Sequence, residues 1–175
     1  MALVVQQSRT VPATVADAFA RTLVLPLPEL FRRWYGPIPP IKAVRGQAGG
    51  SASLDEGEGK LGPPHQPGVE WASVGQTRTV VLTGGGSMRE ELTEVDPPRQ
   101  FAYRLTEITG PLAPLVAYVE GRWQFAPAGT GTTVTWSWVI HPRFRVAAPV
   151  LPVFGRLWKG YARRALERLA ELLAS

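Results

Sequence analysis

Alternating apolar and polar positions predict strands along most of the chain. Residues 3–11 are rich in β-branched side chains and partly alternate, which predicts a first strand. Similar patterns follow after residue 69, separated by turns that are rich in glycine and proline. They predict strands over residues 76–83, 87–95, 100–108, 118–125 and 132–141. The triple glycine at 84–86 and the turn at 128–131 predict two hairpins within this series.

Helical periodicity replaces this alternation in two regions. Thr14 is a good helix N-cap and Asp17 completes a capping box, so a helix is predicted straight after the first strand. A pair of prolines then ends that helix, and a second short helix is predicted over residues 29–35. After Pro149, apolar residues recur every three or four positions, which predicts one long terminal helix. The apolar positions of this helix are Leu151, Phe154, Trp158, Tyr161, Ala162, Ala165, Leu169 and Leu172.

The segment from Gly36 to Gly68 has a different composition, dominated by proline and glycine. Only residues 41–45 within it are typical of a strand. The remainder is predicted to be loop, and it is too long to be a mere connection in a compact domain. Two interpretations of this segment stay open: it is a flexible loop, or it is a functional lid.

The order of elements is strand, two helices, about six further strands and a final helix, which indicates an α+β fold. We expect a curved antiparallel sheet of six to seven strands wrapped around the terminal helix, in a single domain over residues 1–175. Such a sheet encloses a hollow if it does not close completely on the helix.

Composition narrows the possible functions. Hydrophobic content of 45% and charged content of 19% indicate a globular chain rather than a disordered one. The chain has no cysteine, which excludes disulfides and thiolate chemistry, and its two histidines argue against a histidine-rich metal site. We therefore expect no metal and no cofactor.

The net charge of +5 raises the question of nucleic acid. On the terminal helix, however, the basic residues alternate with Glu167 and Glu171, which is typical of a solvated face. No nucleic-acid-binding motif is present, so no nucleic-acid partner is expected. The N-terminal residues do not resemble a leader, and no apolar run approaches the roughly twenty residues of a membrane span. A cytoplasmic monomer or homodimer without stable membrane insertion is expected.

Several short motifs resemble one known group of proteins. They are the strand-to-helix segment 12–19, the segment Gly75 to Val80 followed by Gly86, Glu91, Leu92 and Asp96, the tyrosine at 103, and the hairpin segment 131–136. In these the chain resembles the SRPBCC, or START-like (Bet v 1-like), superfamily, and within it the small bacterial proteins of the polyketide cyclase/dehydrase type. The resemblance implies the helix-grip fold. Members include ligand carriers, aromatase/cyclases, lipid transporters and hormone receptors, so the resemblance implies a hydrophobic pocket without settling the chemistry.

The alternation places many aromatic side chains on one face. In the strand over 132–141, Trp136 and Trp138 share a face with Val134 and Ile140 and should point toward the terminal helix. The same argument applies to the two preceding strands. The predicted ligand-binding residues are Phe101, Leu105, Trp123, Phe125, Trp136, Trp138, Phe154, Trp158 and Tyr161. The alternative is that these side chains form a plain hydrophobic core.

Four residues are candidates for chemistry: Arg78, Glu91, Tyr103 and Glu107. Glu107 follows the inward face of its strand, as Tyr103 does, and could enter the hollow at its mouth; surface exposure near the strand end is the favoured alternative. Arg78 and Glu91 flank the triple glycine on neighbouring strands and could hold and enolise a carbonyl compound. Glu91 is out of step with the inward Leu92, however, so either Glu90 takes its place or a bulge intervenes. A surface salt bridge is the alternative.

Three functions follow from one cavity. The first is a protein that binds a hydrophobic small molecule, polyketide-, lipid- or aromatic-like, between the sheet and the terminal helix. The second is a cyclase, aromatase or dehydratase in which a cavity carboxylate or tyrosine transfers a proton. The third is a carrier or self-protection protein that sequesters a hydrophobic metabolite.

Overall fold

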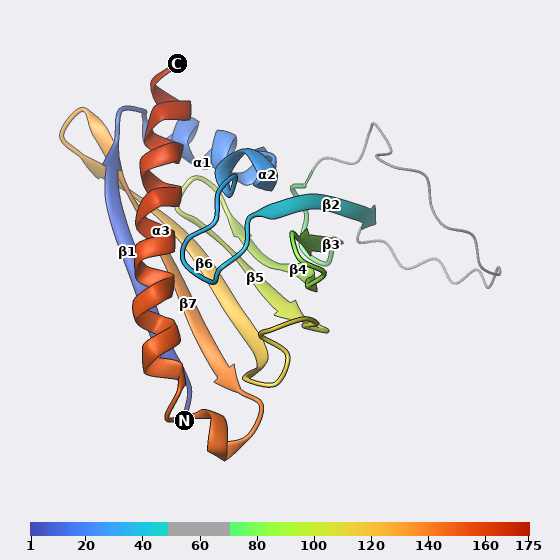
Figure 1. Cartoon of the computed structure of the whole chain (residues 1–175). Helices are drawn as coiled ribbons and strands as arrows, with labels where there is room; N and C mark the ends of the chain where they lie inside the picture. Colours follow the sequence, from blue (N-terminus) through green and yellow to red (C-terminus); the bar gives the residue numbers. More distant parts are fainter. Residues whose placement is uncertain (49–70) are drawn as a thin grey trace.

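The computed structural model describes residues 1–48 and 71–175 (Figure 1). In this part of the chain seven strands form one antiparallel sheet in the order β1-β7-β6-β5-β4-β3-β2. The strands are β1 (Leu3–Val11), β2 (Ile41–Ala48), β3 (Thr77–Leu82), β4 (Ser87–Asp96), β5 (Gln100–Thr106), β6 (Val116–Ala128) and β7 (Gly131–Pro142). The helices are α1 (Val15–Val24), α2 (Leu27–Leu30) and α3 (Leu151–Ala174), with a 3-10 turn η1 (Arg145–Ala147) before α3.

The long helix α3 crosses the concave face of the sheet alongside β1, as Figure 1 shows. Gly155 permits the close approach, because a Cβ atom at this position would press on Leu3 and Val5 of β1. The side of α3 that faces the sheet is apolar, and its buried residues include Leu151, Trp158, Ala162, Leu166 and Leu169. The predicted helix-grip architecture is therefore confirmed.

The two short helices close one end of this layer (Figure 1). Thr14 caps α1, and its hydroxyl accepts a hydrogen bond from the Asp17 backbone N–H at 3.2 Å, as the capping box predicts. Phe19 of α1 packs edge-to-face on Phe101 and Phe125 of the sheet. Arg21 donates hydrogen bonds to main-chain carbonyls in the last turn of α3, which ties the two helices together.

The second predicted helix is only partly correct. The helix α2 occupies Leu27–Leu30, and the chain leaves helical geometry at Phe31, with φ −112° and ψ 58°. The backbone N–H of Ile41 then bonds to the Phe31 carbonyl, so this segment leads into β2 instead of continuing as a helix. Trp34, which falls within the predicted helix over residues 29–35, is 52% exposed.

The predicted strands agree with the observed ones to within a few residues, and the strand at 41–45 extends to Ala48. Residues 49–70 lie outside the described residues, and they include most of the predicted Pro/Gly segment, from residue 49 to its end at Gly68. No helix in the described ranges, 1–48 and 71–175, combines the length and apolarity needed to cross a membrane.

Candidate ligand-binding cavity

A cavity of about 90 Å³ lies between the concave face of the sheet and α3. Its wall is almost entirely apolar and is built from every layer of the fold. The sheet contributes Arg78, Val80, Leu82, Met88, Glu90, Phe101, Tyr103, Leu105, Trp123, Trp136 and Trp138, and α3 contributes Phe154, Trp158 and Tyr161. The α1–β2 region and the β5–β6 connection complete the wall with Thr22, Leu23, Leu25, Leu27, Leu30, Phe31, Ile38, Pro39, Ile41 and Leu112.

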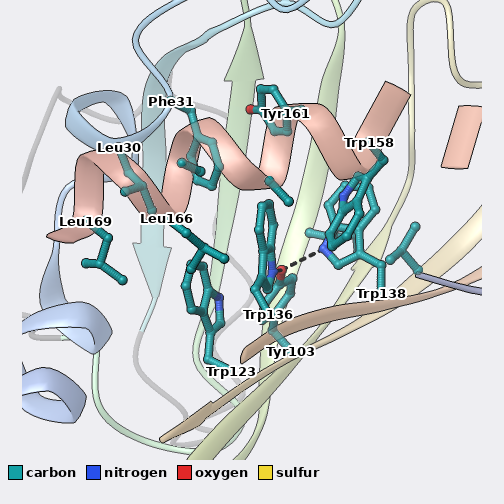
Figure 2. Close-up of a cluster of buried hydrophobic side chains, with 14 of the residues drawn as sticks. Leu30, Phe31, Tyr103, Trp123, Trp136, Trp138, Trp158, Tyr161, Leu166 and Leu169 are labelled. Atoms are coloured by element: carbon teal, nitrogen blue, oxygen red, sulfur yellow. Dashed lines mark hydrogen bonds between the residues drawn. The ribbon is translucent and has the colours of Figure 1, made fainter. Parts of the chain in front are cut away.

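Aromatic rings occupy much of the space between sheet and helix (Figure 2). Trp136 stacks on Trp123 with ring centroids 5.0 Å apart and lies 4.9 Å from Trp158. Trp138 lies 5.5 Å from Trp158. The remaining volume is smaller than the apolar cavities of about 150 Å³ that accept benzene. A ligand larger than a small fragment therefore has to displace some of these rings.

Tyr103 is the polar centre of the cluster. Its hydroxyl oxygen accepts a hydrogen bond from Trp136 Nε1 at 2.7 Å and another from Trp138 Nε1 at 2.8 Å (Figure 2). A phenolic oxygen has two acceptor sites, so both are taken. The described residues provide no acceptor for the Tyr103 O–H itself. Tyr103 is thus a hydrogen-bond donor without an acceptor in the wall of the cavity.

The protonation state of Tyr103 follows from its surroundings. Burial raises the pKa of Tyr103 well above its usual range, and the nearby charge of Glu90 raises it further. The two indole N–H groups and Arg78 act in the opposite direction on this pKa but do not overcome burial. Tyr103 therefore keeps its proton and does not act as a general base near neutral pH.

Arg78 and Glu90 form a buried ion pair in the same wall. Arg78 Nε and Glu90 Oε2 are 2.6 Å apart, and both side chains are more than nine-tenths buried. The Arg78 guanidinium also lies 4.0 Å from the centroid of the Trp71 ring. The β3–β4 register explains the pair, because Arg78 lies directly opposite Glu90. Since a lone buried charge is costly, removing either residue would leave the charge of the other uncompensated.

Two of the four residues predicted to carry chemistry, Glu91 and Glu107, lie outside the cavity. Glu91 is exposed, because the inward positions of β4 are Met88, Glu90 and Leu92. The Glu107 side chain is 72% exposed and lies 3.7 Å from Arg89. β5 ends at Thr106 and Glu107 has a φ of 50°, so the inward alternation does not continue to this residue. Neither Glu91 nor Glu107 supplies an inward carboxylate: Glu90, the predicted alternative to Glu91, takes the inward position, and Glu107 takes the exposed alternative.

Phe125 is buried but is not part of the cavity wall. Its ring packs against Phe19 of α1 and Phe101, so it belongs to the core under that helix. The other eight predicted ligand-binding residues do line the cavity, as do Arg78 and Tyr103.

Sequence analysis did not select two polar residues of the wall, Glu90 and Thr22. Glu90 was only an alternative to Glu91, although the alternation of Met88, Glu90 and Leu92 was a usable signal. Two further polar atoms of cavity-lining residues, Thr22 Oγ1 and Trp158 Nε1, are buried and have no hydrogen-bond partner in the described structure. Within residues 1–48 and 71–175 no three histidine or carboxylate side chains come together as metal ligands would.

Solved structures with the same fold extend over nearly the whole chain. Norcoclaurine synthase from Thalictrum flavum, in complex with dopamine and hydroxybenzaldehyde, superposes with a TM-score of 0.64 at 16% identity, covering 99% of this chain and 87% of that one. Ara h 8.0201 gives 0.60 at 14% identity, covering 99% of both chains. Ginseng major latex-like protein 151 from Panax ginseng gives 0.62 at 12% identity, covering 98% of this chain and 97% of that one. These likenesses establish the Bet v 1-like fold.

The comparison with curated proteins finds no significant match. A family model described as polyketide cyclase / dehydrase and lipid transport, however, matches residues 2–174. The match includes the strands, α1 and α3 that form the cavity. The chain therefore belongs to this polyketide cyclase / dehydrase and lipid transport family, within the SRPBCC superfamily of helix-grip proteins.

Proposed function

We propose that the cavity binds a largely apolar, aromatic molecule that carries an oxygen acceptor, and that Tyr103 orients this molecule by donating a hydrogen bond from its hydroxyl group. The observation that carries the proposal is the pair of indole N–H groups that occupy both acceptor sites of the Tyr103 oxygen. They leave its O–H without an acceptor in a wall that is otherwise almost entirely apolar. Small-molecule sites commonly combine an apolar wall with a few such polar groups.

The aromatic wall favours a ligand with a planar aromatic ring. Stacked and edge-on rings add attraction beyond the area that they bury. Norcoclaurine synthase, which shares the fold, was solved with hydroxybenzaldehyde, an aromatic carbonyl compound. A single-ring molecule already exceeds the free volume and has to displace wall side chains to bind, so first probes are kept to this size.

The test compares acetophenone with ethylbenzene, which has the same ring but no carbonyl oxygen. The indole N–H signals of the tryptophans are followed by NMR during titration. Acetophenone should bind about fivefold more tightly, since a hydrogen bond to a buried donor contributes about 1 kcal/mol net. Equal affinity would contradict the role of Tyr103. Failure of both to perturb the tryptophan signals would contradict the cavity as a binding site.

A matched pair of variants tests the location. Val80 is buried in the cavity wall, whereas Val139 lies on the opposite face of the sheet, between Trp138 and Ile140. Val80→Phe should weaken acetophenone binding by about tenfold or more, because its ring competes for the free volume. Val139→Phe should leave binding unchanged. The assignment fails if folded Val80→Phe binds acetophenone like the unmodified protein.

A second candidate is an enzyme that moves a proton next to a carbonyl group. It is favoured by Glu90, a carboxylate that lines the same cavity and whose charge helps to raise the pKa of Tyr103. Glu90 would accept the proton from carbon while the Tyr103 O–H donates a hydrogen bond to the enolate oxygen. The checking measurement is deuterium exchange into the acetophenone methyl group in heavy water. Exchange that requires Glu90 but survives Glu107→Gln supports the enzyme, and background exchange supports binding alone.

A further inference from the structure

A second hollow lies beside the cavity, on the other side of the Phe31 and Tyr161 rings. It is a groove of about 440 Å³ between the α2–β2 connection and the C-terminal half of α3. Unlike the cavity, it is lined mainly by charged side chains. The lining residues are Leu30, Phe31, Arg32, Arg33, Tyr35, Tyr161, Arg164, Ala165, Glu167, Arg168 and Glu171.

The groove carries an excess of positive charge, with four arginines against two glutamates. Both glutamates already have partners. Glu167 lies 3.7 Å from Arg9, and Glu171 lies 2.9 Å from Arg168. In the described part of the chain, the other three arginines of the groove have no carboxylate within 4.0 Å: these are Arg32, Arg33 and Arg164. Their positive charge is therefore available to an anion.

Two details indicate a prepared site rather than a loose basic surface. The Arg164 guanidinium lies 5.0 Å from the centroid of the Tyr35 ring, which restricts its position. Tyr35 in turn lies across Gly160, where any Cβ atom would overlap its hydroxyl end. Arg168 Nε is buried and has no hydrogen-bond partner among the described residues. A buried N–H donor without an acceptor is unfavourable, and an anion in the groove would supply acceptors.

The groove and the cavity share a wall. Leu30, Phe31 and Tyr161 line both hollows. The Phe31 and Tyr161 rings stack with centroids 5.2 Å apart and lie along α3 in Figure 2. The two hollows therefore adjoin at these residues, and rotation of the Phe31 and Tyr161 side chains is the movement that would join them.

We propose that the groove binds the anionic group of an amphipathic ligand whose apolar part occupies the cavity. This inference rests on the proposed function, because the cavity has to accept the apolar part. The expected class is an aryl or alkyl molecule with a terminal carboxylate, phosphate or sulfate. Planar guanidinium groups bind such oxyanions by paired hydrogen bonds.

The first test compares 6-phenylhexanoate with 6-phenylhexan-1-ol, which has the same apolar part but no charge. Calorimetric titration at low salt should show the carboxylate binding at least about tenfold more tightly, and salt should reduce this preference. Equal affinity of the two would overturn the groove proposal and leave the cavity function intact. If neither binds and acetophenone also fails, the cavity function itself is wrong.

Two double variants test whether the arginines of the groove cause the preference for the carboxylate over the alcohol. Arg33→Gln/Arg164→Gln should abolish the preference for the carboxylate without weakening the alcohol. The matched control is Arg156→Gln/Arg163→Gln, which removes the same charge from exposed positions of α3 outside the groove. A carboxylate preference that survives the first double variant, or is lost equally in the control, would overturn the proposal.

Titration with inorganic phosphate distinguishes a separate site for free anions from a site for the anionic group of an amphipathic ligand. Phosphate should compete with the carboxylate group, so it should lower the affinity for 6-phenylhexanoate to that for the alcohol. It should not perturb the tryptophan indole signals. If phosphate binds in the groove while the protein shows no preference for 6-phenylhexanoate over its alcohol, the groove is a separate anion site and the amphipathic ligand is excluded.

Discussion

Tyr103 lies across Gly121 of the neighbouring strand, so closely that a single methyl group at position 121 would overlap its ring. The two residues are direct partners in the β5–β6 register. The space over Gly121 is therefore filled by Tyr103 and is not left for a ligand, as it can be over a glycine in the middle of a strand. Gly121 makes room for the ring that carries the polar centre of the cavity.

Gly121→Ala should displace Tyr103 and break both of its hydrogen bonds with the indoles. We expect a loss of about 2–4 kcal/mol in the free energy of unfolding, measured by urea denaturation. A double-mutant cycle with Tyr103→Ala provides the control, since removing the ring also removes the clash. Additive effects of the two substitutions would contradict direct contact as the cause.

Tyr103→Phe removes one oxygen atom but leaves two buried indole N–H groups, on Trp136 and Trp138, without an acceptor. Each unsatisfied donor costs about 1–3 kcal/mol, so this variant should be much less stable than its size suggests. Indole N–H chemical shifts would report the loss directly. Tyr118→Phe is the matched control, because no hydrogen bond of the Tyr118 hydroxyl occurs in the described residues. Equal stability of the two variants would argue against the shared acceptor.

The buried Arg78–Glu90 pair should respond very differently to single and paired substitution. Glu90→Gln leaves the Arg78 charge uncompensated and should cost about 3–5 kcal/mol of unfolding free energy. Arg78→Met/Glu90→Leu removes both charges and should be much closer to the unmodified protein. Glu107→Gln, at an exposed ion pair, should change stability by less than about 0.5 kcal/mol. A double variant as unstable as Glu90→Gln would show that the pair contributes beyond charge compensation.

Stability should fall at alkaline pH because of two buried tyrosines. Burial raises the pKa of Tyr103 and of Tyr161 above the ordinary value of about 10, and the folded protein keeps both protons where the unfolded chain loses them. The unfolded state then binds fewer protons, so the free energy of unfolding is intact below about pH 10 and decreases above it. Urea denaturation between about pH 8 and 11 measures this slope.

Tyr103→Phe should make the alkaline slope shallower than in the unmodified protein. Tyrosinate absorbance provides an independent reading, because these two hydroxyls should ionise only as the protein unfolds. Early ionisation of all four tyrosines in the folded protein would contradict the buried assignment.

Local patterns were sufficient to predict the strand and helix order, the cap of α1 at Thr14, the inward face of β7 and most of that of α3, where Leu173 is buried instead of the predicted Leu172. These features depend on spacing within one element, such as the alternation of Val134, Trp136, Trp138 and Ile140. For the same reason eight of the nine predicted ligand-binding residues line the cavity.

Only the tertiary structure decided how these faces meet. The pairing of Arg78 with Glu90 depends on the register between two strands, and the exposure of Glu107 depends on where β5 ends. The shared acceptor at Tyr103 joins β5 to β7 across β6, and the arginine groove joins α3 to the α2–β2 connection. A periodic pattern indicates which side of an element is buried. It does not indicate which distant side chain lies opposite a given residue, because that depends on the packing of the whole chain.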